Sequence, residues 1–157
     1  MGREYHFYVY ILTNYRKTVL YIGITDNLIR RIIEHKFGFG SSFTHRYNLK
    51  YLIYFEEYRY VKTAIAREKE LKGWIRQRKI DLIKKDNPLL LDLSQKIFRE
   101  FGYTSESIKS YAEEVRSLYL IDPSRGAQDD KNKGMAKRKG VEMVKPDLKI
   151  SSLGFKF

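Results

Sequence analysis

The sequence predicts an α+β fold, in which helices flank a small three-stranded antiparallel sheet. Two short runs rich in aromatic and β-branched residues, at 8–12 and 20–24, are typical of strands, and the short polar segment between them predicts a β-hairpin. A third such run, at 50–56, predicts the third strand. Segments with apolar residues every three or four positions follow the second and third runs. The predicted order is β-β-α-β-α-α, followed by a helical and partly disordered C-terminal extension.

Tyr10 and Tyr21 lie in the two predicted strands of the hairpin. Side chains alternate between the faces of a strand, so a suitable register would place both tyrosines on one surface. Gly23 shares that face with Tyr21 and, because it has no side chain, would let a ligand or a helix approach there. The hairpin therefore predicts a site in which two phenol groups stand on one face of the sheet.

The first predicted helix has Thr25 or Asp26 as its N-cap and continues to about Lys36 without Gly or Pro. The stripe of residues three or four apart consists of Leu28, Arg31, Ile32 and His35. A guanidinium and an imidazole thus share the apolar face that should pack against the sheet, where a charged group needs a partner or a ligand. Arg30 and Glu34 lie off this stripe and are expected to be solvated.

Glu68 interrupts the apolar stripe of the second predicted helix, which runs from about 61 to 73. The stripe consists of Val61, Ala64, Ile65, Glu68 and Leu71. A carboxylate on a core-facing stripe must be protonated, paired or bound to a cation. Near a phosphate, a hard cation such as Mg²⁺ with water in its remaining positions is the favoured interpretation. The alternative is an ion pair with Arg31 or with a nearby lysine.

The composition is strongly basic, with 31 Lys and Arg residues against 19 Asp and Glu residues and a net charge of +12. Such a charge favours a polyanionic partner, and interleaved aromatic residues favour nucleic acid. The chain has no cysteine, which excludes disulfides and thiolate zinc sites. No apolar run approaches the roughly 20 residues of a bilayer span, and the first residues lack a signal-peptide pattern. We therefore expect a cytoplasmic protein with no membrane partner.

These residues resemble the GIY-YIG nuclease family, in particular its small stand-alone bacterial members. The segment Tyr21-Ile22-Gly23 matches the second motif of the family name, and Tyr8-Val9-Tyr10 keeps the tyrosine of the first motif but has Tyr8 in place of its glycine. The resemblance covers about residues 5–94. The site residues that it implies are the catalytic Tyr10, Tyr21, Arg31 and His35, the metal ligand Glu68, and Asn87 as catalytic or structural support.

The resemblance implies an endonuclease that hydrolyses DNA phosphodiester bonds with one Mg²⁺ or Mn²⁺ ion. One of the two tyrosines would take a proton from the attacking water, Arg31 would stabilise the transition state, and His35 would relay a proton or bond to the phosphate. Independently of the resemblance, we expect Thr44, Arg46 and Tyr47 to contact the backbone of the DNA substrate. No separate sequence-reading domain is evident, which favours structure-directed cutting in DNA repair or processing. The alternatives are a catalytically weak nucleic-acid-binding module and a protein-interaction subunit of a repair complex.

Three segments are predicted: a nuclease domain at 1–94, a helical extension at 95–121 and a basic, disordered tail at 122–157. The basic residues of the tail that would touch backbone phosphates are Lys131, Lys133, Lys137, Arg138 and Lys139. The alternative for this tail is a solvated run of charge without a specific partner.

Overall fold

The computed structural model describes residues 5–39 and 41–121. Its elements in chain order are β1 (Phe7–Thr13), β2 (Leu20–Thr25), α1 (Leu28–Lys36), α2 (Ser42–Arg46), β3 (Tyr51–Tyr58), α3 (Val61–Gly73), α4 (Arg76–Asp86), α5 (Ser94–Glu100) and α6 (Ser105–Ile121). The predicted α+β class is confirmed. The predicted tail, with its five basic residues, lies outside the described residues.

The sheet has the strand order β2-β1-β3, and both pairs of neighbouring strands are antiparallel. The central strand β1 places Tyr10 opposite Gly23 and Leu12 opposite Tyr21 on β2. Since side chains at positions two apart share a face, Tyr10 and Tyr21 project from the same side of the sheet. The register that the two tyrosines need is therefore present.

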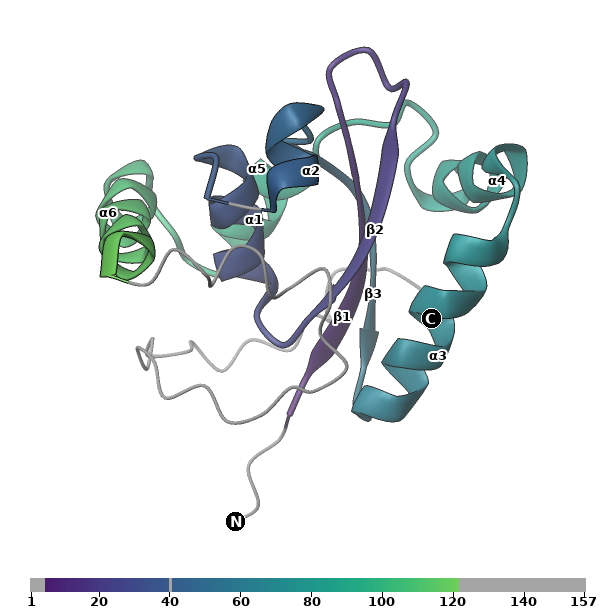
Figure 1. Ribbon diagram of the computed structural model, residues 1–157, viewed down its shortest axis with the longest axis horizontal. Coiled ribbons are helices and arrows are strands. Elements are labelled where there is room, and N and C mark those ends of the chain that lie inside the picture. The colour runs from purple at the N-terminus through teal and green to yellow at the C-terminus, as the bar shows by residue number, and fades with distance from the viewer. Residues whose placement is uncertain (1–4, 40, 122–157) are drawn as a thin grey trace.

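Helices cover both faces of the sheet (Figure 1). The helices α1, α2, α5 and α6 lie on one side, and α3 and α4 lie on the other. The alternation of β1 follows this division: Tyr8, Tyr10 and Leu12 pack toward α1, whereas Val9 and Ile11 pack toward α3. The sheet is thus buried on both faces, which explains why β1 is apolar along nearly its whole length.

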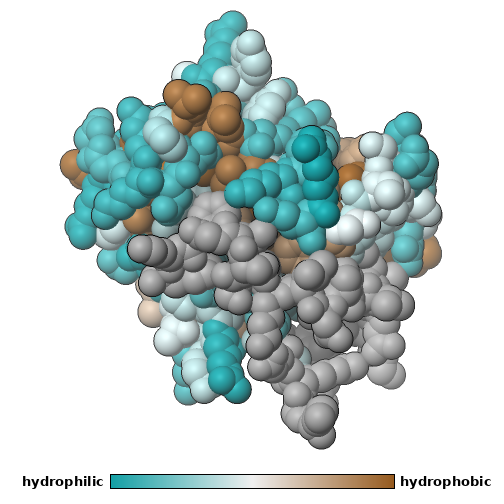
Figure 2. All heavy atoms as spheres, turned by 180° about the vertical axis from the view of Figure 1, so that it is seen from behind, coloured by the Kyte–Doolittle hydropathy of each residue, from teal (hydrophilic) through white to brown (hydrophobic). Residues whose placement is uncertain are grey.

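The last two helices extend the core on the α1 side. Ile97 and Phe98 of α5 and Tyr111 and Val115 of α6 are buried in the same cluster as the apolar residues of α1. The predicted boundary at residue 94 stays a prediction, but both helices beyond it pack against α1. Seen from behind, the surface of the described residues is mainly hydrophilic, with its hydrophobic side chains in small groups (Figure 2).

Two short segments differ from the predicted elements. The N-cap of α1 is Asn27, whose side chain accepts the backbone N–H of Arg30 at 3.0 Å. Thr25, one of the two predicted caps, instead accepts the N–H of Asn27 at 3.1 Å. The helix α2 was not predicted; Ser41 caps it and accepts the N–H of Thr44 at 3.3 Å. None of the described helices is long and apolar enough to cross a lipid bilayer.

Candidate active site

Tyr10 lies at the centre of a polar cluster that is otherwise surrounded by the core. Its side chain is 1% exposed, and its ring lies across the backbone of Gly23 on the neighbouring strand. A Cβ atom at position 23 would collide with the ring carbons and the hydroxyl of Tyr10. The close approach that Gly23 permits is therefore that of Tyr10, rather than that of a ligand or a helix.

Two side chains of α1 reach the Tyr10 hydroxyl. Arg31 donates to it from Nε at 2.8 Å, and Nε2 of His35 lies 3.3 Å away from it. Arg31 and His35 are one helical turn apart, so both point from the same face of α1 toward the sheet. The predicted stripe of α1 thus delivers its guanidinium and its imidazole to one phenol.

The direction of each hydrogen bond follows from the donors available. Arg31 can only donate, so the Tyr10 hydroxyl accepts from it and can donate its own proton to Nε2 of His35. The hydrogen of the ring then belongs on Nδ1, which lies 3.2 Å from the Thr44 hydroxyl. Thr44 in turn donates to the carbonyl of Ser41 at 3.0 Å. We infer an ordered chain from Arg31 to Ser41, with this tautomer of His35 fixed by Thr44.

The environment of His35 keeps its imidazole neutral. Burial lowers the pKa of His35 well below 6.5, and the positive charge of Arg31 lowers it further. A protonated ring would have no lone pair to accept the Tyr10 hydroxyl. The lowered pKa of His35 and its role as acceptor for the Tyr10 hydroxyl therefore both require a neutral imidazole.

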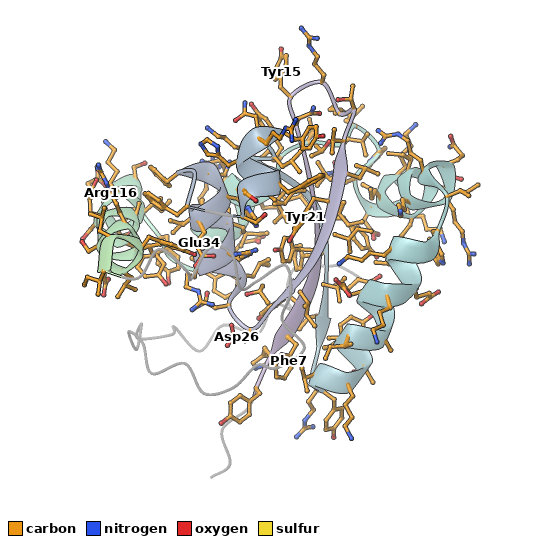
Figure 3. The ribbon with its side chains drawn as sticks, viewed as in Figure 1. Phe7, Tyr15, Tyr21, Asp26, Glu34 and Arg116 are labelled. Carbon is orange, nitrogen blue, oxygen red and sulfur yellow. The ribbon has the colours of Figure 1, made fainter. Side chains whose placement is uncertain are left out.

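Glu34 is buried, and the prediction that it is solvated surface is wrong. Its side chain accepts a hydrogen bond from a terminal nitrogen of Arg31 at 2.9 Å and pairs with Nε of Arg30 at 3.4 Å. Glu34 lies on α1 on the side that faces α6 (Figure 3). Burial raises the pKa of Tyr111 on α6 to about 12, and the negative charge of Glu34 also acts to raise it. The i, i+3 spacing from Arg31 was the available signal for this pair.

Tyr21 joins the cluster from the edge strand β2. Its ring centroid lies 6.2 Å from that of Tyr10 and 5.9 Å from that of His35. Unlike Tyr10, it is only partly buried, and it projects from β2 on the α1 side of the sheet (Figure 3). The structure therefore brings together the four residues that the sequence predicted to be catalytic.

Glu68 lies on the other side of the sheet, on α3 (Figure 1). It occupies the face of that helix between Ala64 and Leu71, which are fully buried, and its own side chain is 15% exposed. Its carboxylate pairs with Lys72 one turn later, which is the nearby-lysine alternative from the sequence. The pair is accessible, because the Lys72 side chain is 54% exposed.

The donor set around Glu68 suits one kind of metal ion. The described residues contain no group of three or more His, Cys, Asp or Glu side chains that could hold a metal. An ion at Glu68 would therefore have fewer than three such protein ligands and complete its shell with water or substrate oxygens. Mg²⁺ is commonly bound in this way. The ion would replace the Lys72 ammonium group as the cation beside the Glu68 carboxylate.

Asn87 and Thr44 occupy structural positions. The Asn87 side chain donates to the carbonyls of Ile53 and Leu91, at 3.0 and 2.8 Å, and accepts the N–H of Leu91 at 2.9 Å. It thus ties the end of α4 to β3. Thr44 is 3% exposed and supports His35, whereas Arg46 on the same helix is exposed. Of these three residues, Arg46 is the one placed to meet a substrate.

Comparison with known proteins identifies the family. Residues 6–81 match the model of the GIY-YIG catalytic domain. This segment contains the four residues predicted to be catalytic and the predicted metal ligand: Tyr10, Tyr21, Arg31, His35 and Glu68. The chain belongs to the GIY-YIG family. Gly23 is the glycine of its Tyr-Ile-Gly motif, and Tyr10 is the tyrosine of its first motif, Tyr8-Val9-Tyr10. These two residues are the pair that lies face to face on β1 and β2.

The curated relatives of this GIY-YIG chain come from bacteria and archaea. It is 35% identical over 79 residues to a UPF0213 protein of Haloquadratum walsbyi, which covers 50% of this chain and 86% of the relative. It is 37% identical to a UPF0213 protein of Pediococcus pentosaceus, over 55% and 90% of the two chains. For a UPF0213 protein of Clostridium perfringens the values are 34% identity over 63% and 95%. No solved structure matches the chain.

Proposed function

We propose that this GIY-YIG protein is a divalent-metal-dependent endonuclease that hydrolyses phosphodiester bonds in DNA. The observation that carries the proposal is the Tyr10 hydroxyl, which contacts both Arg31 and His35 beside the ring of Tyr21. A phenol held by a guanidinium and a neutral imidazole is a costly arrangement in a protein core. Proton transfer during phosphodiester hydrolysis would explain why this buried polar arrangement is present.

The two tyrosines have different roles in this proposal, because they differ in exposure. A general base must reach the attacking water, and Tyr10 is buried at 1% exposure. Tyr21, partly exposed on the edge strand, is the tyrosine that would take the proton from water. A free phenol has a pKa near 10, so Tyr21 needs positive charge nearby to act as a base at neutral pH. Tyr10 would act as a positioning residue that holds Arg31 and His35.

Arg31 would supply that positive charge. Its guanidinium is fixed by Tyr10 on one side and by Glu34 on the other. A charge held in a low-dielectric site costs little reorganisation when negative charge develops on the phosphate in the transition state. His35, neutral and hydrogen-bonded to Tyr10, would orient the phenol and could take up a proton through it.

Glu68 would hold the metal ion. The strand β2 forms the edge of the sheet, so Tyr21 on one face and α3 on the other both border this edge. When bound, Mg²⁺ or Mn²⁺ supplies Lewis-acid stabilisation of charge on the phosphate and the leaving oxygen. The Glu68–Lys72 pair would have to open for this ion.

The net charge of +12 and the family both favour a nucleic acid as the substrate. We propose structure-directed cutting of DNA in repair or processing. The second candidate is a catalytically weak DNA-binding module. One observation favours it: Lys72 already neutralises the Glu68 carboxylate.

A cleavage assay with the full chain tests the proposal. End-labelled single-stranded, duplex and branched DNAs would be incubated with Mg²⁺, with Mn²⁺ and with a chelator. We expect cutting in metal only, and its loss in Glu68→Gln. The matched control is Glu70→Gln, which changes a carboxylate on the exposed side of the same helix. DNA binding without cutting under every metal condition would establish the binding module instead.

A further inference from the structure

We propose that Phe43 of α2 and Tyr47, the C-cap of that helix, form a stacking platform for an unpaired nucleobase beside the candidate active site. The platform deepens the proposed function, because it selects single-stranded DNA and single-stranded regions of branched DNA as substrates. The binding part of the inference stands on the geometry of α2. The cutting part rests on the proposed nuclease activity.

The two rings are exposed and adjacent. Phe43 is 42% exposed and Tyr47 is 41% exposed, and their ring centroids are 4.6 Å apart. Phe43 in α2 and Tyr47, the C-cap of this helix, are four positions apart, so their side chains leave the segment on the same side. Single exposed aromatic residues are common on protein surfaces, but these two are in contact, with their ring planes tilted by 49°, and together form a partly exposed apolar patch.

The platform is continuous with the candidate site. Phe43 lies 6.1 Å from the ring of Tyr21, and Tyr21 lies 5.9 Å from the ring of His35. A row of rings therefore leads from the exposed Tyr47 to the buried imidazole. A base stacked on the outer rings would place the neighbouring phosphate at Tyr21.

A buried side chain between the two rings in sequence fixes the platform in place. Thr44, between the two exposed rings in sequence, is buried and bonds to His35. The N-cap Ser41 accepts the backbone N–H of Thr44 and its carbonyl accepts the Thr44 hydroxyl. The same short segment thus holds the imidazole through Thr44 and presents the two aromatic rings of Phe43 and Tyr47. Such preorganisation lowers the entropy cost of binding.

The charge around the platform matches the backbone of a nucleic acid strand. No Asp or Glu occurs between His35 and Phe55 in the sequence. Arg46 and Lys50 are exposed in this segment, and the Arg46 guanidinium lies 5.9 Å from the centroid of the Tyr47 ring. Aromatic rings beside cationic side chains are the pattern by which proteins bind single strands.

Stacking on a side chain requires a base that is not already stacked in a duplex. In a continuous double helix the faces of each base are covered by its neighbours, whereas a single strand, flap or loop can present them. One stacked base changes affinity by roughly 5- to 150-fold. The platform should therefore favour unpaired DNA over duplex DNA by a measurable factor.

The first experiment measures binding of the full chain, in a chelator so that no strand is cut. Single-stranded and duplex oligonucleotides that contain 2-aminopurine would be titrated, with base fluorescence and anisotropy as readouts. We expect the Phe43→Ala/Tyr47→Ala protein to lose about 10-fold or more in single-strand affinity, and less in duplex affinity. Phe43→Tyr/Tyr47→Phe keeps both rings and should bind normally.

Two further variants separate stacking from other effects. Tyr15→Ala and Tyr60→Ala remove exposed rings outside α2 and should leave both affinities unchanged. Phe43→Leu keeps an apolar side chain against Tyr21 but has no aromatic face, so it should lose affinity while melting like the wild type. Equal affinities for single strands in the alanine and ring-conserving proteins would overturn the platform. Equal losses on single-stranded and duplex DNA would do so as well.

The second experiment repeats the comparison with Mg²⁺ and scores cutting. We expect the ratio of single-strand to duplex cleavage to fall in the alanine protein. If the wild type cuts nothing but the binding results hold, the nuclease proposal fails and the platform stands. If the wild type cuts and the alanine protein keeps both its affinity and its cleavage ratio, the platform fails and the nuclease proposal stands.

Discussion

The ring of Tyr10 on β1 occupies the space in which a side chain of Gly23 on β2 would stand. The glycine of the Tyr-Ile-Gly motif thus leaves space for Tyr10, the tyrosine of the Tyr8-Val9-Tyr10 motif. This relationship gives the paired motifs a physical meaning: one strand supplies the phenol, and the other leaves room for it to reach α1.

Gly23→Ala should therefore disturb the site. The added methyl group overlaps the phenol of Tyr10, and we expect a loss of about 1–3 kcal/mol in the free energy of unfolding together with slower cleavage. Denaturant unfolding measures the first effect. In a Tyr10→Ala background the same change should cost much less, because the overlapping ring is absent. An equal cost in both backgrounds would contradict the account.

The burial of His35 predicts a pH dependence of stability. The unfolded chain takes up a proton on this residue near pH 6.5, whereas the folded state does so only at a pH well below that value. The unfolded state then binds more protons in this window, so stability falls as the pH drops from about 7 through 6.5 toward the lowered pKa. The loss would end below the folded-state pKa.

Unfolding of wild type and His35→Gln across this pH range measures the effect. We expect this part of the slope to disappear in the variant. His45→Gln changes an exposed histidine near the site and serves as the control. A wild-type slope that survives in His35→Gln would assign the pH dependence to another group.

Arg31→Lys should impair the protein although the charge is kept. Arg31 contacts Tyr10 through Nε and Glu34 through a terminal nitrogen, two directions that an ammonium group cannot reproduce. Buried groups left without a partner cost about 1–3 kcal/mol each. We expect a lower melting temperature and a cleavage rate reduced more than DNA affinity. Wild-type rates in the lysine protein would place Arg31 outside the reaction.

Much of the site follows from local periodicity. Strand alternation predicted that Tyr10 and Tyr21 share a face in a suitable register, and the helical stripe predicted that Arg31 and His35 point to the sheet. The first inference depends only on one hairpin, and the second depends only on the spacing of residues within one helix. The structure brings the four side chains together as those periodicities require.

The supporting residues depend on contacts between distant segments. Glu34 is buried because α6, some seventy residues later in the chain, packs on α1. Thr44 supports His35 through α2, a five-residue helix too short to show periodicity. Its one sequence signal, the Ser41 cap, also occurs in ordinary turns. Which side chains of α2 are exposed could not be predicted without the contact between Thr44 and His35.

The rate of single-turnover cleavage by Tyr21→Phe most directly tests the claim that this cluster cuts DNA. Wild type, Tyr21→Phe and Tyr10→Phe would be compared on labelled single-stranded DNA at saturating protein and Mg²⁺. If Tyr21 is the base, its variant should melt like the wild type and cut about 10²- to 10⁴-fold more slowly. Tyr10→Phe should lose stability as well as rate, because Arg31 and His35 lose their shared partner. A Tyr21→Phe protein that cuts as fast as the wild type would contradict the account.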